Sequence, residues 1–299
     1  MAGVSRRSAV AATALVTSVL ALSACGGRGP SAGSAAEMAA KAKPLHILRA
    51  PKNLLAAAEP QQNGTMWVLA GNSASRGLFQ LDPSNGNVLG STSVSDAAQS
   101  VAETSSGVLG LAIGTRQAGA LELMDSHTGK VTRTLTLPAP AQQVVTGSDG
   151  STLYVLTDQR SVASVSIVDA ESGRVTGTIP VPKDAVSVVP NLGQTALYAL
   201  RGNGLVSRIA IAGGKVTDEF KIGASGNSLA LSPDGTTMYA LKDADTAPNI
   251  AVVNMATESV LRAQSAPTGA RQVLVSGDGH QLYDVVGTPA YGNIQVFRA

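Results

Sequence analysis

Aromatic and charged side chains are scarce in this sequence. Only 3% of the residues are aromatic and 14% are charged, and the chain has one cysteine and one tryptophan. So little charge excludes both an acidic disordered chain and a strongly basic nucleic-acid binder. A single cysteine cannot form an internal disulfide. The 299 residues are instead 44% hydrophobic and include 32 glycines, a composition that favours compact all-β structure with many turns.

The N-terminus has the pattern of a secretory signal. Arg6 and Arg7 precede a run of small and apolar residues, 9–24, which is too short to span a bilayer comfortably. We therefore predict that residues 1–24 are a signal peptide. The run ends in Leu-Ser-Ala-Cys, which resembles the lipobox of bacterial lipoproteins. The resemblance implies that Cys25 receives diacylglycerol, becomes the mature N-terminus and anchors the protein to a membrane on its extracytoplasmic side.

The segment that follows the cysteine is poor in large apolar residues. Residues 25–43 are rich in Gly, Ala and Ser, and such a segment cannot bury enough surface to fold alone. We interpret it as a flexible tether to a domain that spans residues 44–299. Without Arg6 and Arg7 the chain has 20 basic and 20 acidic residues, so global charge gives no reason to expect nucleic acid as a partner.

The domain is built from a repeat of about 43 residues. The clearest marker is a turn glycine that recurs at intervals of 42 to 44 residues: Gly64, Gly107, Gly150, Gly193, Gly235 and Gly279. A second turn keeps the same period and includes three aspartates that we interpret as turn caps: Asp82, Asp125 and Asp169.

Each repeat contains four short runs of β-branched or apolar residues separated by turn residues. In the third repeat these runs are 143–146, 152–156, 164–169 and 174–181. A four-stranded meander has two faces to bury, so its copies must pack face to face, which predicts a β-propeller. The last repeat supplies only three strands, and residues 45–49 are predicted to complete it. We therefore expect six blades, closed by an N-terminal strand in the last one; the alternative is seven blades.

Two repeats resemble a known family. Residues 231–241 read LSPDGTTMYAL and are followed by IAVVN, and residues 150–156 read GSTLYVL, followed by VSIVD. These segments resemble the YVTN repeat of bacterial surface and periplasmic propellers, over roughly residues 44–299. The resemblance implies an extracytoplasmic protein that is more often non-enzymatic than an enzyme. Many members of that family have seven blades, from which a count of six departs.

Functional residues are expected on the face where outer strands connect to the next inner strand. Counting back from the turn glycines places mostly neutral amides at the mouth of the central channel, and we predict a ligand-binding set of Gln99, Gln142, Asn227 and Arg271. Their alternative role is only to bind water in a solvated channel. Loops on the same face carry a basic rim predicted to bind an acidic protein or polymer through Arg76, Arg116, Arg160, Arg201 and Lys242.

Catalytic patterns are poor. The predicted channel mouth has no Asp or Glu to compensate a metal, and His46, His127 and His280 are not expected to converge on one. We therefore expect no catalytic residue, no metal and no cofactor. The function predicted is a monomeric binding or scaffold platform that presents its loops to an envelope protein or an anionic polymer. The alternatives are a small-ligand binding protein or chaperone that serves a transporter, and a propeller lyase or lactonase.

Overall fold

The described part of the chain forms an all-β domain. The computed structural model describes residues 39–40, 43–60, 64–159, 162–223, 225–242 and 247–299, which belong to one compact unit, Ala35–Ala299. The predicted signal peptide 1–24, Cys25 and Arg160 lie outside the described residues. Among the described residues, no helix is long and apolar enough to cross a membrane.

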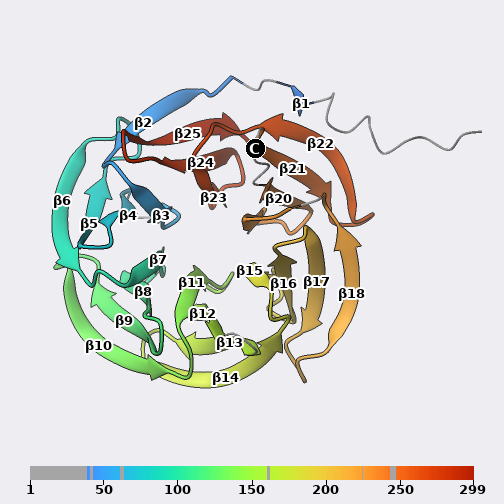
Figure 1. Ribbon diagram of the computed structural model, residues 1–299, viewed down its shortest axis with the longest axis horizontal. Helices are drawn as coiled ribbons and strands as arrows, with labels where there is room; N and C mark the ends of the chain where they lie inside the picture. The colour runs from blue at the N-terminus through green and yellow to red at the C-terminus, as the bar shows by residue number, and fades with distance from the viewer. Residues whose placement is uncertain (1–38, 41–42, 61–63, 160–161, 224, 243–246) are drawn as a thin grey trace, which may run out of the picture. The chain divides into compact units, whose positions relative to one another are not determined.

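Six sheets, each built on four antiparallel strands, are arranged around a central axis as the blades of a β-propeller (Figure 1). Blade 1 consists of β3 (Leu54–Ala57), β4 (Met66–Asn72), β5 (Ser75–Leu81) and β6 (Val88–Val94). Blade 2 consists of β7 (Ala98–Glu103), β8 (Val108–Gly114), β9 (Gly119–Asp125) and β10 (Lys130–Leu137). Blade 3 consists of β11 (Ala141–Thr146), β12 (Thr152–Gln159), β13 (Val162–Asp169) and β14 (Arg174–Val181). Blade 4 consists of β15 (Ala185–Pro190), β16 (Ala196–Arg201), β17 (Leu205–Ala210) and β18 (Val216–Lys221). Blade 5 consists of β19 (Ser228–Leu231), β20 (Thr237–Lys242), β21 (Asn249–Asn254) and β22 (Ser259–Ser265), with β1 (Ala39–Ala40) on its outer edge. Blade 6 consists of β23 (Ala270–Val275), β24 (Gln281–Gly287), β25 (Gly292–Arg298) and β2 (His46–Ala50).

The N-terminal strand β2 closes the ring. It pairs antiparallel with β25 from His46 opposite Val296 to Ala50 opposite Gly292, so the last blade combines the two ends of the domain. Figure 1 shows β2 lying along β25. The six-bladed prediction and the closing strand are therefore confirmed, and the seven-bladed alternative is wrong.

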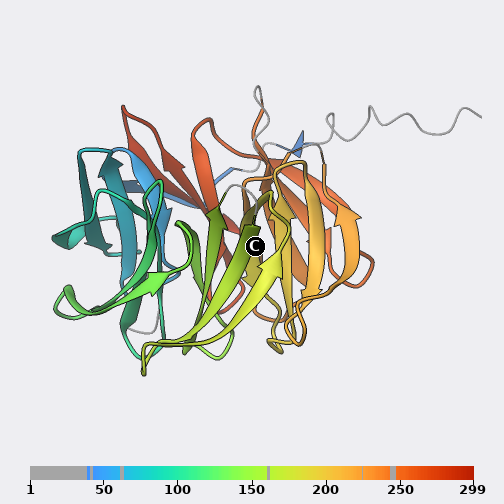
Figure 2. The ribbon, with the colours of Figure 1, turned by 60° about the horizontal axis from the view of Figure 1, so that its bottom comes forward.

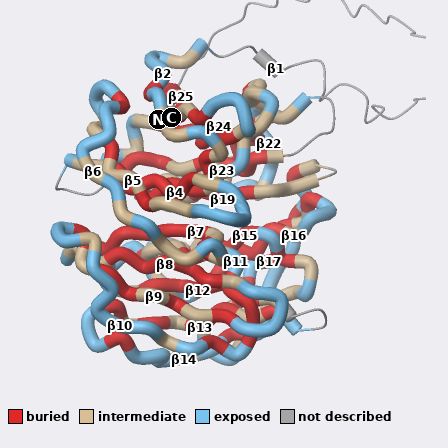
Figure 3. The backbone as a smooth tube through the Cα atoms, turned by 60° about the vertical axis from the view of Figure 1, so that its left-hand side comes forward, coloured by how far each residue is buried: buried red, intermediate tan, exposed pale blue. Residues whose placement is uncertain are grey.

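The hydrophobic core is divided among the six seams between neighbouring blades. Each buried cluster combines residues of two adjacent blades; Leu48, Val68 and Val285, for example, belong to the cluster between blades 6 and 1. Figure 3 shows burial concentrated on the second and third strands, while the outer strands β6, β10 and β14 are largely exposed. Successive side chains of a strand point to opposite faces of its blade. The second and third strands bury both sets of side chains, because each blade has a neighbour on either side.

The two faces of the ring differ in their connections. We call the face with the outer-to-inner and second-to-third connections the loop face, and the opposite face the turn face. Strands run between these faces in each blade (Figure 2). On the turn face Asp82, Asp125 and Asp169 accept backbone hydrogen bonds from residues two or three positions ahead, at 2.7 to 3.0 Å, so their interpretation as turn caps is confirmed.

One turn glycine was assigned to the wrong position. Five of the six have φ between 70° and 80°, but Gly193 is not among the positive-φ residues; Gln194 takes that conformation instead, with φ of 49°. The Gln194 amide closes the turn onto the Asn191 carbonyl, as the Gly150 amide does onto Gly147. A hydrogen bond of 2.7 Å from the Tyr154 hydroxyl to Gln194 Oε1 helps to hold this unusual residue in place.

Candidate functional site: the central channel

In five of the six blades, a polar residue near the start of the inner strand joins neighbouring blades. Inner strands β3, β7, β11, β15 and β23 carry a bulge, and the next residue directs its side chain to the following blade. These side chains accept hydrogen bonds from backbone amides of the next inner strand: Ser100 from Val144 (3.3 Å), Gln143 from Val188 (2.7 Å), Ser187 from Leu229 (3.0 Å), Ser228 from Val273 (3.2 Å) and Gln272 from Ala57 (2.8 Å). Blade 1 has Ala56 at this position, which offers no side-chain acceptor.

The residues predicted at the channel mouth lie beside this ring of hydrogen bonds. Gln99, Gln142 and Arg271 are bulge residues, and Asn227 immediately precedes β19. Gln99 Nε2 donates to the Gly114 carbonyl oxygen at 3.4 Å, and Arg271 Nε donates to the Gly287 carbonyl oxygen at 3.1 Å. The structure therefore places the predicted set around one end of the channel, and their role in ligand binding stays a prediction.

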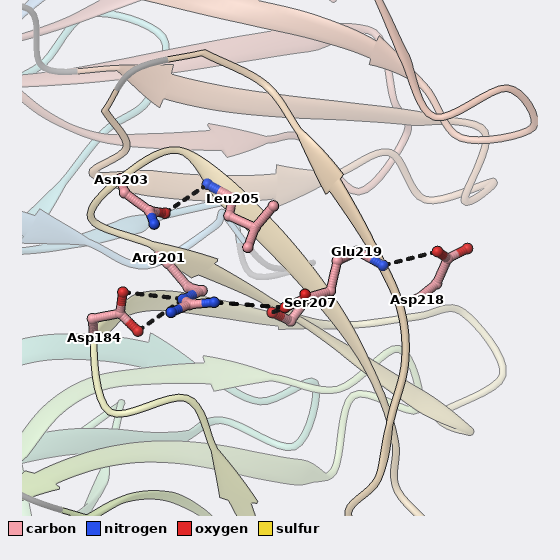
Figure 4. Close-up of polar contacts among 7 residues, drawn as sticks. All are labelled: Asp184, Arg201, Asn203, Leu205, Ser207, Asp218 and Glu219. Atoms are coloured by element: carbon pink, nitrogen blue, oxygen red, sulfur yellow. Dashed lines mark hydrogen bonds and ion pairs between the residues drawn. The ribbon is translucent and has the colours of Figure 1, made fainter.

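Two arginines of the predicted rim make contacts within the protein. Arg201 Nε lies 2.8 Å from Asp184 Oδ1, and its Nη1 is 3.6 Å from Glu219 Oε1 (Figure 4). Arg76 donates to the Ala98 carbonyl oxygen in blade 2. Burial lowers the pKa of Arg76, while the charge of Asp96 opposes that shift.

The remaining rim residues differ in exposure. Arg116 is exposed in the connection between β8 and β9. Lys242 is partly buried, and burial lowers the pKa of its ammonium group. Its aliphatic chain covers Gly223, so part of this lysine serves to pack the loop face.

A cavity of about 750 Å³ occupies the channel and reaches the turn face. Its walls come from inner strands and include Val101, Val144, Val189, Leu229 and Leu274. At the turn-face end it is lined by four carboxylates: Glu59, Glu103, Asp149 and Asp278. Among the described residues that line it, none is a lysine, arginine or histidine.

The four carboxylates have different environments. Burial, with a smaller contribution from Asp278, raises the pKa of Glu59 to about 7. Asp278 has a lowered pKa because it accepts hydrogen bonds from the Ser276 hydroxyl and the His280 amide. Burial alone would raise the pKa of Asp149, but hydrogen bonds from Thr152 and Ser151 outweigh it and hold that pKa well below its usual range.

Glu103 completes the acidic end of the cavity and is only 2% exposed. With Asp149 and Asp278 ionised at neutral pH, this end of the channel is electronegative, and its apolar walls limit solvent screening. The arrangement suits an ammonium or guanidinium group whose aliphatic part contacts the valines and leucines. No group of three or more His, Cys, Asp or Glu within the described chain is placed to hold a metal ion.

The sequence analysis does not predict the acidic end, because the candidate residues it points to lie at the opposite end of the inner strands. Asp149 and Asp278 precede turn glycines, where an Asp-Gly pair is read as turn chemistry. Glu103 lies near the end of an inner strand, four residues before its turn glycine, and Glu59 follows the end of another. Acidic residues that recur just before the turn glycine are the signal that would have identified this end.

Comparisons with known proteins support the architecture. No family model matches the chain, and no curated relative matches it either. Among solved structures it is similar to a chain of Kuenenia stuttgartiensis hydrazine synthase, with 16% identity, a TM-score of 0.65 and coverage of 82% of this chain and 83% of that one. It is also similar to the Myceliophteria thermophila Cps50 (Swd1) β-propeller domain, with 11% identity, a TM-score of 0.63 and coverage of 86% and 99%. At these identities the likeness establishes the β-propeller fold alone.

Proposed function

We propose that this protein is a non-catalytic binding module, held outside the cytoplasm by lipid on Cys25, that recognises a cationic segment of an envelope protein. The cavity of about 750 Å³ with its acidic end is the observation that supports this proposal most directly. Its volume falls in the range of ligand-binding sites, and it lies on the axis of a rigid ring. The signal-like N-terminus and the resemblance to YVTN propellers support the extracytoplasmic location.

The chemistry of the cavity defines the ligand class. Glu59, Glu103, Asp149 and Asp278 line one end, and none of the described lining residues is a lysine, arginine or histidine. A lysine or arginine side chain can place its methylene groups against Val101 and Val144 and its charge at the carboxylates. Because the cavity opens on the turn face, the partner would approach from that side.

The loop-face rim supports a second candidate function. Three exposed basic residues belong to this side of the ring: Arg116, Arg49 and Lys52. They would favour an anionic polymer or an acidic protein. Arg201 and Arg76 contribute less to such a surface because they contact Asp184, Glu219 and Ala98 within the protein.

A pair of peptides of opposite charge distinguishes the two functions. Fluorescence anisotropy would measure binding of a labelled Lys/Arg-rich peptide and of a Glu/Asp-rich peptide of equal length to the detergent-solubilised full chain. We expect the cationic peptide to bind, with an affinity that falls at least tenfold in the Glu59→Gln/Glu103→Gln double variant. The matched Arg116→Ser/Lys242→Ser variant should bind it normally.

The outcomes separate the proposals. Recognition at the acidic end would be refuted if the cationic peptide did not bind, or if the Glu59→Gln/Glu103→Gln variant bound it as tightly as the parent. Binding of the anionic peptide that is lost in the Arg116→Ser/Lys242→Ser variant would instead establish the rim function. Binding should also weaken as salt rises, because the charges at the mouth of the cavity are partly screened.

A further inference from the structure

A single aspartate interrupts the aliphatic core at the seam between blades 5 and 6. Asp284 lies in β24 and pairs with Val273 of β23 and Gln295 of β25. Strand register places five buried aliphatic residues at the same position in the other blades: Val68, Leu111, Val155, Ala199 and Ala240. Blade 6 therefore departs from the repeat at a site where every other blade is apolar.

The carboxyl group of Asp284 faces blade 5. Directly paired residues of neighbouring strands share a face, and Val273 packs in the cluster formed by blades 5 and 6, with Leu241 and Ile250. Asp284 is 0% exposed. Within the described part of the chain, neither of its carboxyl oxygens has a hydrogen-bond partner.

The facing sheet supplies a second buried polar group without a partner. Gln264 of β22 pairs with Ile250 and is 3% exposed, and its Nε2 has no hydrogen-bond partner among the described residues. A buried polar atom without a partner costs free energy, and an unpaired buried charge costs more. This seam therefore contains buried polar atoms without hydrogen-bond partners among the described residues, which a purely aliphatic seam would not.

Charged neighbours do not account for the state of this carboxyl. The titratable groups on faces packed against it are Tyr239 and Arg262 of blade 5, and Arg271 and Arg49 of blade 6. Burial alone raises the pKa of Asp284 to about 7. The carboxyl is accordingly neutral in mildly acidic conditions and ionises near neutrality.

The N-terminal strands lie on the outer edges of the same two blades. β1 pairs in parallel with β22 through Ala39 and Ala40, and β2 pairs with β25. The two N-terminal strands are thus paired with the outer edges of both blades that meet at this seam. A change in the packing of this seam would act directly on the place where the predicted tether joins the ring.

We propose that the seam between blades 5 and 6 is a proton-controlled joint, closed while Asp284 is protonated and loosened when Asp284 ionises. In the unfolded chain this carboxyl ionises near pH 4, whereas in the folded chain it does so near pH 7. Its favourable contribution is therefore complete below about pH 4 and is lost as the pH rises to about 7. Each unit of pKa difference is a tenfold change, so the unfolding constant rises by up to about a thousandfold from this residue.

Unfolding at several pH values tests the joint. Thermal and urea unfolding of the full chain would be compared with those of Asp284→Asn and Asp284→Val between pH 5 and 8. We expect the stability of the parent to fall relative to each variant as the pH rises. The Glu59→Gln variant is the matched control: it removes the other carboxyl that titrates near pH 7 and should leave the Asp284-dependent fall unchanged.

Hydrogen exchange locates the effect. At pH 8 the amides of β19 to β25 should exchange faster in the parent than in Asp284→Asn, and at pH 5.5 they should exchange equally fast in both. The two proteins are compared at the same pH, so the pH dependence of the intrinsic amide exchange rate cancels. Faster exchange confined to blades 5 and 6 supports the joint. An identical pH dependence of stability in parent and variants, or a difference spread evenly over all six blades, would overturn it.

Discussion

Side-chain acceptors around the channel set the strength of individual seams. Five blades use Ser or Gln to bind an amide of the next inner strand, and blade 1 offers only Ala56. The Val101 amide at the corresponding position of blade 2 therefore receives no side-chain acceptor from its neighbour. The seam between blades 1 and 2 lacks a bond that the other five have.

Replacing Ala56 with serine should add the sixth bond. Ala56 occupies the position of Ser100, Ser187 and Ser228, so a serine hydroxyl there can accept from the Val101 amide. We expect Ala56→Ser to raise stability by about 1 kcal/mol, measured by urea unfolding. Ser187→Ala is the converse control and should destabilise by about 1 to 3 kcal/mol, since it leaves a buried amide unpaired. A destabilised Ala56→Ser would show that no acceptor fits at this seam.

Glu59 predicts a pH-dependent stability of its own. Its folded-state pKa of about 7 exceeds the ordinary value of 4.5, so its contribution to stability is present at pH 4 and lost as the pH rises through 7. The stability of Glu59→Gln minus that of the parent should therefore increase by roughly 2 to 3 kcal/mol between pH 5 and pH 8. Equal pH profiles of Tm for the two proteins would contradict this.

At the residue scale the sequence predicted turn chemistry better than site chemistry. Asp82, Asp125 and Asp169 were identified as caps because an aspartate with its own turn amides ahead of it is a local pattern. The acidic channel end was not found, because Glu59 and Glu103 meet only after six distant segments have formed a ring. Gln194 was not predicted because glutamine is an unusual residue at positive φ, and side-chain hydrogen bonds with Tyr154 and Asp149 help to hold it there.

The closing strand shows how much one element can contribute. β2 has one fully buried side chain, Leu48, which is 1% exposed and packs in the cluster between blades 6 and 1, whereas Ile47 is 53% exposed. The strand is therefore held by Leu48 and by its ladder to β25.

Substitutions in β2 should differ sharply by position. Leu48→Ala is expected to lower the free energy of unfolding by about 2 to 5 kcal/mol, because it removes buried methyl groups and leaves a cavity. Ile47→Ala, on the exposed face of the same strand, should change it by less than about 0.5 kcal/mol. Urea unfolding of the two variants measures this difference, and similar losses would mean that β2 is not anchored through Leu48.

Element boundaries were predictable where the repeat is regular. In blade 3 the predicted strands agree with β11 to β14 to within a few residues at each end, because turn residues separate them clearly. The bulges in the inner strands were not predicted. A bulge adds one residue to one strand without an obvious sequence signature. The turn of blade 4 was misplaced by one residue for another reason, because Gln194 and not Gly193 takes the positive-φ position.

At the scale of the whole molecule, the stability of the ring depends more on the contacts between neighbouring blades than on the order in which the chain connects them. Leu45 donates its backbone amide to the Val296 carbonyl at 2.7 Å, so the start of the domain lies beside its end. A short linker from Ala299 to Pro44 would make β25 and β2 a continuous hairpin. The chain can then be opened at another connection without removing a strand.

Two circular permutants compare the seams directly. One is opened at residues 95–97, between blades 1 and 2, and the other at residues 182–184, between blades 3 and 4. Both should fold, and the first should have the lower Tm, because its open seam lacks a bond like the one in the second, where Gln143 Oε1 accepts from the Val188 amide. Equal Tm values would show that these inner bonds do not determine ring closure.

The closing strand also sets the order in which the protein can be completed. β2 is among the first strands of the domain to leave the ribosome, but its partner β25 is the last strand of the propeller. Until β25 has been made, Leu48 lacks the blade 6 half of its cluster, and the ring stays open however well the middle blades have formed. A chain without β25 would therefore remain an open arc with an unpaired edge and a poorly buried leucine, the features that proteases and chaperones recognise.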